Sequence, residues 1–355
     1  MRKKRNSGSG KKFLLLYLLV VIAVTVFGTY FAYDKYTGIF SPNVVIDKSE
    51  NYIYIPTGAS FELVVDHLVE QKYIRDRESF EWVAEKKKYK GNIKPGRFKI
   101  KANMSNNELV NLLRSGKQDP VKVSFNNIKS KEALAGALTR NLEADSVNLL
   151  RMLNNRTVAE KYGFTTTTIL TMFIPNTYEF YWNTSEEKLL ERMAKEYKKF
   201  WTDERRQLAA DMGLTQTEVY VLASIVQAEQ NQHDTEKPLI AGLYLNRIRI
   251  GMPLQSDPTV KFATGLHDAK RILAADKDID SPYNTYKYKG LPPGPINLPE
   301  VSSIDAVLNY KKNNNVYMCA KEDLSGFHYF TNDFKQHLIY AEKYQKALNK
   351  MGIMR

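Results

Sequence analysis

The sequence contains a single cysteine, Cys319, in 355 residues, so no disulfide can form within the chain. The five histidines show no spacing typical of metal ligands, and no cysteine–histidine pair indicates a nucleophile. They are His67, His233, His267, His328 and His337. We expect each of them to be a surface or supporting residue. The sequence therefore predicts neither a bound metal nor another cofactor.

Acidic residues are missing from the first twelve positions, which carry six of the 52 lysines and arginines. The net charge of +13 would suggest a nucleic-acid partner, but only +7 remains once this tail is set apart. RNA-binding signatures and zinc-finger spacings are missing too. We therefore expect no nucleic acid, and a basic exterior would suit another anionic polymer.

Charged residues are also missing from residues 13–33, a run of 21 that is almost entirely apolar. At about 1.5 Å per residue, a helix of this length spans the ~30 Å hydrocarbon layer of a membrane. A signal peptide is the alternative, but its apolar region is usually ~7–15 residues long and a small-residue cleavage site follows it. We expect a retained transmembrane helix, with the basic tail 1–12 in the cytoplasm and everything after Asp34 outside.

The rest of the chain is long enough for two domains with their own cores. Its strand and helix patterns predict the α+β class. We expect a tether at 34–50, a small module at 51–119 and a larger domain at 120–355, with Asp119-Pro120 as the boundary. In the module, a strand at 52–55, helices after Ser60 and around Phe80, a strand at 97–100 and a helix capped by Ser105 and Glu108 are predicted.

The larger domain should contain strands at 121–125, 316–320 and 327–330, and helices at 130–138, 145–162, 186–208, 302–310 and 335–350. Aromatic residues are dense between Phe173 and Trp182 around Pro175. Such a stretch is compatible with a sugar-binding cleft, because pyranose faces stack on rings, and equally with a core.

The chain is organised around residues 215–251. Thr215 and Glu218 form a capping box, and the apolar positions 219, 222, 223, 225 and 226 follow at helical spacing. Glu229 ends this apolar stripe, where it either turns to solvent, pairs with Arg247 or serves a function. A second helix with Ile240, Leu243, Tyr244 and Ile248 inward ends at Gly251, so an αα-hairpin is predicted around 231–236.

Three proline-stiffened segments follow at 252–260, 281–286 and 290–296, and rigid loops on a scaffold often build sites. The series ASIVQAE, LYLNRIRIGMPLQSDPTV, SPYNTY and GLPPGPI resembles the MltG/YceG-like family of endolytic murein (peptidoglycan) transglycosylases over nearly the whole chain. Two positions depart from the family pattern. Gln227 stands where an acid is common, and Thr171-Met172 replaces Glu-Gly before the P-[DN]-T-Y stretch.

The resemblance implies a membrane-anchored lyase that cuts within peptidoglycan glycan strands and leaves 1,6-anhydro ends. It implies a LysM-like module between the anchor and a YceG-like catalytic domain, a place on the outer side of the cytoplasmic membrane, and partners among wall-synthesis proteins. Glu229 would be the catalytic acid and then the base. The residues expected to bind substrate are Asn246, Gln255, Asp257, Tyr283, Asn284, Thr285 and Tyr286. Structural roles, such as helix bridging by Asn246, are open for each of them.

Glycoside cleavage needs a carboxylic acid that is protonated near neutral pH, whereas an ordinary glutamate has a pKa of ~4.3. Burial against the apolar stripe would raise the pKa of Glu229. Two other functions remain as alternatives. Asp257 could act as a second carboxylate in a hydrolase, and a chain without activity could serve as a wall-binding scaffold.

Overall fold

The computed structural model describes residues 8–48, 50–266, 269 and 272–352, and the chain divides into two compact units of mixed α and β structure. Unit 1 comprises Met1–Val121 with Tyr181–Asn183, and unit 2 comprises Lys122–Phe180 with Thr184–Arg355. The division after Val121 lies two residues beyond the predicted boundary between Asp119 and Pro120. Residues 1–7 of the basic tail and His267 lie outside the described residues.

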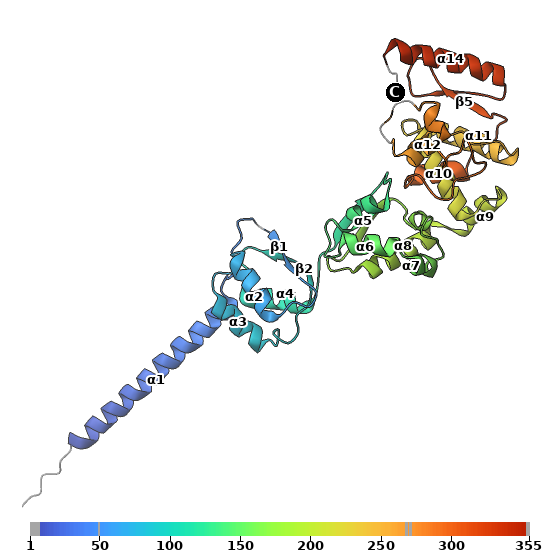
Figure 1. The fold of residues 1–355 in the computed structure, drawn as a ribbon. Coiled ribbons are helices and arrows are strands. Elements are labelled where there is room, and N and C mark those ends of the chain that lie inside the picture. The colour runs from blue at the N-terminus through green and yellow to red at the C-terminus, as the bar shows by residue number, and fades with distance from the viewer. Residues whose placement is uncertain (1–7, 49, 267–268, 270–271, 353–355) are drawn as a thin grey trace, which may run out of the picture. The chain divides into compact units, whose positions relative to one another are not determined.

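A long helix, α1 (Gly8–Phe40), opens unit 1 (Figure 1). Residues Gly10–Phe40 are long and apolar enough to cross a membrane, with a mean hydropathy of 2.4 in the most apolar window. From Phe13 to Tyr33 the large apolar side chains are exposed. A single helix with apolar side chains on its whole surface fits a lipid environment better than water. The helix α1 is therefore compatible with a membrane anchor.

The structure differs from the free tether expected at 34–50. Residues up to Phe40 continue α1, and bridges then join Pro42 to Ser105 and Val44 to Ile74. Val44 is only 2% exposed and belongs to the apolar core of the unit. Gly38 and Pro42 are of residue types that often interrupt secondary structure. Gly38 is instead accommodated inside the helix, and its carbonyl accepts a hydrogen bond from Asn106.

The module in unit 1 has two antiparallel strands and three helices. Its elements are β1 (Glu50–Ile55), α2 (Phe61–Glu70), α3 (Arg77–Lys86), β2 (Gly96–Lys101) and α4 (Asn106–Ser115). The strands pair from Glu50 with Lys101 to Ile55 with Gly96. The predicted capping box of Ser105 and Glu108 is present. It fixes where α4 begins and leaves Leu109 and Leu113 in the core.

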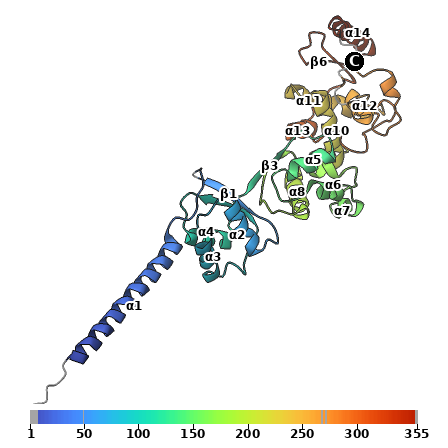
Figure 2. The same cartoon turned by 60° about the vertical axis from the view of Figure 1, so that its left-hand side comes forward.

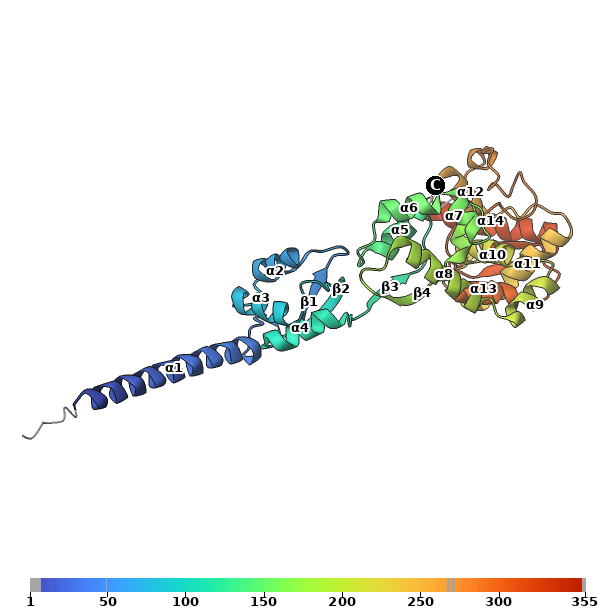
Figure 3. The same cartoon turned by 90° about the horizontal axis from the view of Figure 1, so that it is seen from below.

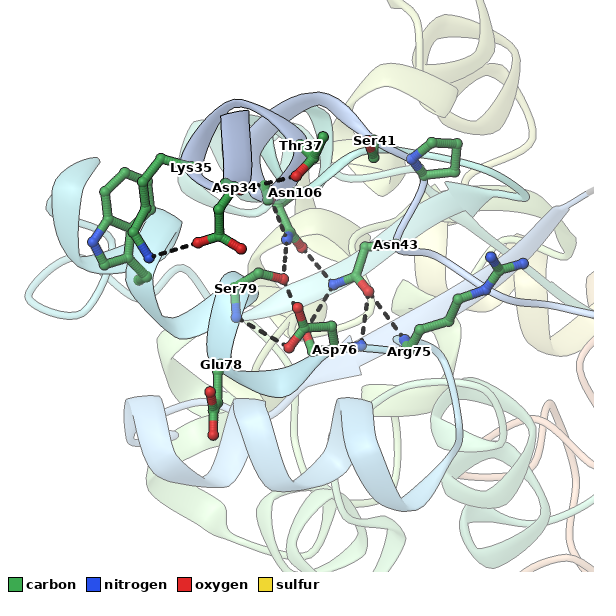
Figure 4. A pocket seen from close by; sticks show the side chains of 13 residues that line it. Asp34, Lys35, Thr37, Ser41, Asn43, Arg75, Asp76, Glu78, Ser79 and Asn106 are labelled. Atoms are coloured by element: carbon green, nitrogen blue, oxygen red, sulfur yellow. Dashed lines mark hydrogen bonds and ion pairs between the residues drawn. The ribbon is translucent and has the colours of Figure 1, made fainter. Parts of the chain in front are cut away.

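A buried polar network joins the end of α1 to α3 and α4 (Figure 4). Asn43 donates to the Asp76 carbonyl and to Asn106 Oδ1, and its own Oδ1 accepts from the backbone N–H groups of Arg75 and Asp76. Asn106 donates to the Gly38 carbonyl and to Ser79 Oγ. Both amide donors of each side chain are thus used. A cavity of about 520 Å³ opens beside the network.

Unit 2 begins with a strand pair and short helices, and two helices predicted as continuous are broken. Its elements are β3 (Val121–Phe125), α5 (Lys131–Thr139), α6 (Ser146–Leu153), α7 (Arg156–Lys161), η1 (Ile169–Met172), β4 (Asn176–Phe180), α8 (Glu186–Phe200) and α9 (Asp203–Asp211). The helix predicted at 186–208 ends before Trp201, because Thr202 caps a new helix by accepting from the Arg205 N–H. Asn155 likewise divides the predicted helix at 145–162.

The aromatic stretch after Phe173 contributes mainly to the core. Phe173, Tyr178 and Phe180 are at most 6% exposed, and the Phe125 ring stacks on Tyr178 at 5.7 Å. Trp182 lies in unit 1, where its ring packs edge-on against Tyr54. These contacts support the interpretation of the stretch as packing rather than as a sugar cleft.

The centre of unit 2 is α10 (Gln216–Glu229), with α11 (Lys237–Arg249) and α13 (Val301–Leu308) beside it (Figure 3). The capping box of Thr215 and Glu218 is present as predicted. Every residue from Val219 to Gln227 is buried, so α10 is enclosed on all sides rather than along one stripe. The short helix η2 (Asp234–Glu236) connects α10 to α11, and Gly251 follows α11 with a φ of +68°.

Two further parts of unit 2 bear on the site. The segment 252–260 was expected to be a loop, but α12 (Asp257–Thr264) begins inside it, because proline is well tolerated in the first turn of a helix. The helix η3 (Ala275–Asp278) precedes the loop at 281–286. At the C-terminal end, β5 (Tyr317–Ala320) pairs antiparallel with β6 (His328–Thr331), and α14 (Phe334–Lys350) packs on both (Figure 2).

Candidate active site

Glu229 is the last residue of α10, and two hydroxyl groups hold one of its carboxylate oxygens. Tyr244 Oη donates to Glu229 Oε1 at 2.6 Å, and Ser256 Oγ donates to the same oxygen at 2.5 Å. Tyr244 comes from α11, whereas Ser256 directly precedes α12. Within the described part of the chain, Oε2 of Glu229 has no hydrogen-bond partner. One oxygen is therefore fixed and the other is free.

The surroundings raise the pKa of the Glu229 carboxyl above its ordinary value. Burial is the main cause, because it disfavours the charged form, and the nearby charge of Asp257 adds to it. The hydrogen bonds from Ser256 and Tyr244 and the influence of His328 act in the opposite direction. Since burial prevails, Glu229 keeps its proton to a higher pH than an exposed glutamate does.

Ser256 is positioned by Thr285 of the SPYNTY segment. The Ser256 N–H donates to Thr285 Oγ1 at 3.0 Å, the Gln255 N–H donates to the Thr285 carbonyl at 3.0 Å, and the hydroxyl groups of Thr259 and Thr285 lie 2.9 Å apart. Ser256 and Thr285 are both 1% exposed. A buried hydroxyl chain therefore fixes the donor that Glu229 uses.

Asn284 lies beneath this loop and is fully buried. Its amide donates to the carbonyls of Lys277 and Ile279, each at 2.8 Å, and its Oδ1 accepts from the Tyr286 N–H. Because all these partners belong to the protein, Asn284 shapes the loop that carries Thr285 and Tyr286. The structure does not bring its side chain to an accessible surface.

Arg247 does not form an ion pair with Glu229. Such a pair therefore does not explain why an acid ends the apolar helix α10. Its guanidinium donates instead to the carbonyls of Val316, Pro253 and Leu254, and it is 6% exposed. It also reaches Gln255 Oε1 at 3.3 Å. Gln255 is exposed and has a φ of +51°, a conformation that non-glycine residues rarely adopt. The Arg247 contacts hold the segment before Ser256 in this strained form.

Asp257 stands beside Glu229 in a second cluster. Tyr286 Oη donates to Asp257 Oδ1 at 2.6 Å, and Lys277 Nζ lies 3.5 Å from the same oxygen. Lys277 also donates to Tyr286 Oη at 2.9 Å. Burial, followed by the charge of Asp257, raises the pKa of Tyr286. Asp257 therefore places a partly exposed negative charge next to the acid.

Two of the expected substrate-binding residues make contacts of a different kind. Asn246 donates to the carbonyls of Asn313 and Asn315 at 2.8 and 3.0 Å, which supports the interpretation that it bridges α11 to a loop. Tyr283 is half-buried and packs its ring 4.7 Å from that of Phe262. Among the described residues, neither side chain is hydrogen-bonded to the Glu229 cluster.

Gln227 faces α13 rather than the Glu229 cluster. Its Oε1 accepts from the Glu300 N–H at 2.6 Å and from Ser303 Oγ at 3.0 Å, and the side chain is 5% exposed. Gln227 thus caps the start of α13. An acid could make the same contacts, since a helix N-terminus favours negative charge.

Sequence reasoning missed the roles of Tyr244, Ser256 and Arg247. Tyr244 was placed inward as a packing residue, although a buried tyrosine hydroxyl needs a partner and this requirement was a usable signal. Ser256 and Arg247 gave no local signal, because their partners are distant in the chain. Among the described residues, no group of three or more His, Cys, Asp or Glu side chains could hold a metal ion.

Known proteins resemble this chain over most of its length. It is 27% identical over 343 residues to an endolytic murein transglycosylase of Bacillus subtilis, covering 92% of each chain. It is 25% identical to endolytic murein transglycosylases of Streptococcus pneumoniae, covering 92% of this chain but 64% of theirs. A crystal structure of a yceG-like protein from Listeria monocytogenes matches with a TM-score of 0.54 and 24% identity, over 82% of this chain and 99% of that one.

The last of these matches supports the fold alone. The family model of the YceG-like family matches residues 53–343, which includes most of the module in unit 1 and nearly all of unit 2. The chain therefore belongs to the YceG-like family.

Proposed function

We propose that this protein is a lytic transglycosylase that cuts peptidoglycan within its glycan strands, between N-acetylmuramic acid and N-acetylglucosamine. The observation that carries the proposal is Glu229, a carboxyl with a raised pKa, one oxygen held by two hydroxyls and the other free. The relatives named endolytic murein transglycosylase support the reaction class. The substrate is thus the polymer on which those relatives are named to act.

In the first step, Glu229 protonates the oxygen of the glycosidic bond. Tyr244 and Ser256 donate to Oε1, so the acidic proton belongs on Oε2. As the bond from the anomeric carbon to the leaving oxygen breaks, the carboxyl becomes a carboxylate. The two hydroxyl donors then stabilise the developing negative charge, and the pKa raised by burial favours a bound proton before the step.

In the second step, the same carboxylate takes the proton from the 6-hydroxyl of the muramic acid. The 6-oxygen bonds to the anomeric carbon and closes a 1,6-anhydro ring, so the proton that Glu229 gave is restored. No water is consumed and no second carboxylate is needed. One glutamate with one free oxygen suffices for both transfers.

The remaining residues divide into two groups. Gln255, Asp257 and Tyr286 lie around the acid with exposed or partly exposed side chains, and we assign the sugar contacts to them, with Tyr283 at the edge. Asn284 and Thr285 are buried and position the loop that carries Ser256. Asn246 is assigned the bridging role that its hydrogen bonds indicate.

A hydrolase that uses Asp257 is the competing reaction, because two carboxyl groups flank the bond in such enzymes. The hydrogen bond from Tyr286 and the nearby Lys277 occupy Oδ1 of Asp257, which favours a role in charge and loop position. Digestion of intact sacculi in ¹⁸O-water distinguishes the two. We expect 1,6-anhydromuramic ends without ¹⁸O, whereas reducing ends that carry ¹⁸O would establish hydrolysis and make Asp257 catalytic.

The anchor and the module belong to the same proposal. We assign α1 to the cytoplasmic membrane, with the basic tail inside and unit 2 outside, where it would act on strands close to the membrane and meet wall-synthesis proteins.

The strand, two helices and strand of unit 1 support a LysM-like module. Full-length protein should resist salt extraction, and a soluble form starting between Phe27 and Asp34 would show a cleaved signal. Release of no fragment from sacculi would favour a scaffold.

A further inference from the structure

A carboxylate and an imidazole form a partly buried pair directly beyond Glu229. Glu236 accepts from the His328 N–H at 3.0 Å and faces His328 Nδ1 at 2.9 Å. Gln230, the residue after Glu229, donates to Glu236 at 2.8 Å. Glu236 is 7% exposed and Gln230 is 2% exposed. The network therefore joins the end of α10, the helix η2 and the strand β6.

The pair fixes which ring nitrogen carries a proton. Burial would raise the pKa of Glu236, but the hydrogen bonds from His328 and Gln230 prevail and lower it. Glu236 is therefore a carboxylate, and the nitrogen that faces it, Nδ1, must be the donor. Nε2 on the opposite side of the ring has no hydrogen-bond partner among the described residues.

The His328 ring resembles the Glu229 carboxyl in one respect. Each has two polar atoms, of which one has a hydrogen-bond partner and the other has none among the described residues. His328 lies close enough to Glu229 to influence its carboxyl electrostatically, as do Asp257 and the Tyr244 hydroxyl. A carboxylate that holds one imidazole nitrogen orients the ring and presents the other nitrogen to a reacting molecule. The side chain of His328 is 12% exposed, which leaves it an accessible edge.

We propose that His328 is a further substrate-contacting residue of the Glu229 site, with Glu236 as its positioning residue and Nε2 hydrogen-bonded to the glycan. Because the proton is on Nδ1, Nε2 accepts a hydrogen bond from a hydroxyl group of a sugar next to the cleaved bond. The inference rests on the proposed function, since it takes the glycan as the ligand. It adds His328, whose ring Glu236 orients through Nδ1. No pattern in the sequence indicated a role for this residue.

Two substitutions separate substrate contact from support of the fold. In His328→Asn, the side-chain amide stands near the position of Nδ1 and keeps the bond to Glu236, but nothing replaces Nε2. In His328→Gln, the amide reaches the position of Nε2, and the bond to Glu236 is lost. We expect His328→Asn to lower kcat/KM by about 10- to 100-fold while thermal stability stays near that of the wild type. His328→Gln should retain more activity than His328→Asn and be less stable.

The opposite ranking of activities, or equal activities, would show that His328 only supports the fold. A double-mutant cycle adds a second readout. Glu236→Gln should cost activity in the wild-type background and little in the His328→Asn background, because its effect passes through Nε2. Additive losses would overturn the positioning role. If the wild-type protein releases no glycan fragments from sacculi, the proposed function itself fails, and this result is distinguishable from active wild type with equally active His328→Asn.

Discussion

The polar network around Asn43 and Asn106 in unit 1 and the cluster around Glu229 in unit 2 are built from similar hydrogen bonds but differ in one respect. Both amide hydrogens of each asparagine have a partner, and Oδ1 of Asn43 accepts twice. In the Glu229 cluster, the described residues leave Oε2 without a partner. The hydrogen-bond donors of the first cluster are all used within the protein, whereas the second leaves one oxygen available to a ligand.

This difference indicates what each cluster does. A buried polar group that is fully paired stabilises one conformation, and it has no capacity left for a ligand. A half-buried acid with a raised pKa and one free oxygen is costly to the fold and is therefore a candidate for chemistry. The strained backbone of Gln255 lies beside the second cluster, as expected for a site that the fold supports at some cost.

The largest effect should come from Glu229→Gln. The amide oxygen can still accept from Tyr244 and Ser256, but the side chain can neither give nor reclaim a proton. We expect the rate of sacculus digestion to fall by about 10²- to 10⁴-fold with the circular dichroism spectrum unchanged. A loss below tenfold would assign the chemistry to another residue.

Breaking the complete network should affect stability and not the reaction. Asn43→Ala leaves the backbone N–H of Asp76 without its acceptor, whereas the N–H of Arg75 keeps its bond to the Asn43 carbonyl. We expect the free energy of unfolding of unit 1 to fall by about 1–3 kcal/mol for each buried group left unpaired. Asn111→Ala is the matched control, because this exposed side chain accepts one hydrogen bond among the described residues, from Lys87. If Asn43→Ala lowered the cleavage rate per folded molecule more than it lowered stability, the distinction between a structural and a catalytic cluster would be contradicted.

Removing one donor from Glu229 should have a smaller effect of a different kind. The Ser256 hydroxyl lowers the pKa of Glu229 by stabilising the carboxylate. Ser256→Ala should therefore raise that pKa further, move the basic limb of the pH–rate profile to higher pH and lower the maximal rate about tenfold. Thr264→Val, which removes a hydroxyl of α12 that donates to the carbonyls of Val260 and Lys261, should leave the limb in place. A shift to lower pH in Ser256→Ala would refute the assigned hydrogen bond.

The smallest effect is expected for Gln227→Glu. The new carboxylate would accept from the Glu300 N–H and Ser303 at the start of α13, where negative charge is favoured. Activity and melting temperature should both change little. A large loss of activity would mean that the acid common at this position in the family is not interchangeable with glutamine in this chain.

The sequence was sufficient to predict α10, its capping box and Glu229 at its end, because each depends on residues within a few positions. It failed where partners are far apart. Ser256 lies 27 positions from Glu229, and the contact depends on Thr285 another 29 positions away. The segment that contains Asp257-Pro258 was expected to be a loop, although the same pair also begins helices, and only the packing of α12 decides between them.

The expected tether failed for a similar reason. Gly38 and Pro42 are local signals for a break, yet the hydrogen bond from Asn106 to the Gly38 carbonyl spans 68 positions. Buried asparagines look like loop residues in a sequence, since nothing local distinguishes a buried amide from an exposed one. The sequence therefore could not predict the polar network of Asn43 and Asn106, because its members lie far apart in the chain.

The central claim is that burial keeps Glu229 protonated to a higher pH than an ordinary glutamate, and NMR titration of ¹³C-labelled glutamate carboxyls tests it most directly. The resonance that disappears in Glu229→Gln identifies the group. We expect it to titrate above the ordinary value of ~4.3, with the shift reduced when burial is relieved. Titration at or below that value would contradict the account, because the residue would then hold no proton to give at neutral pH.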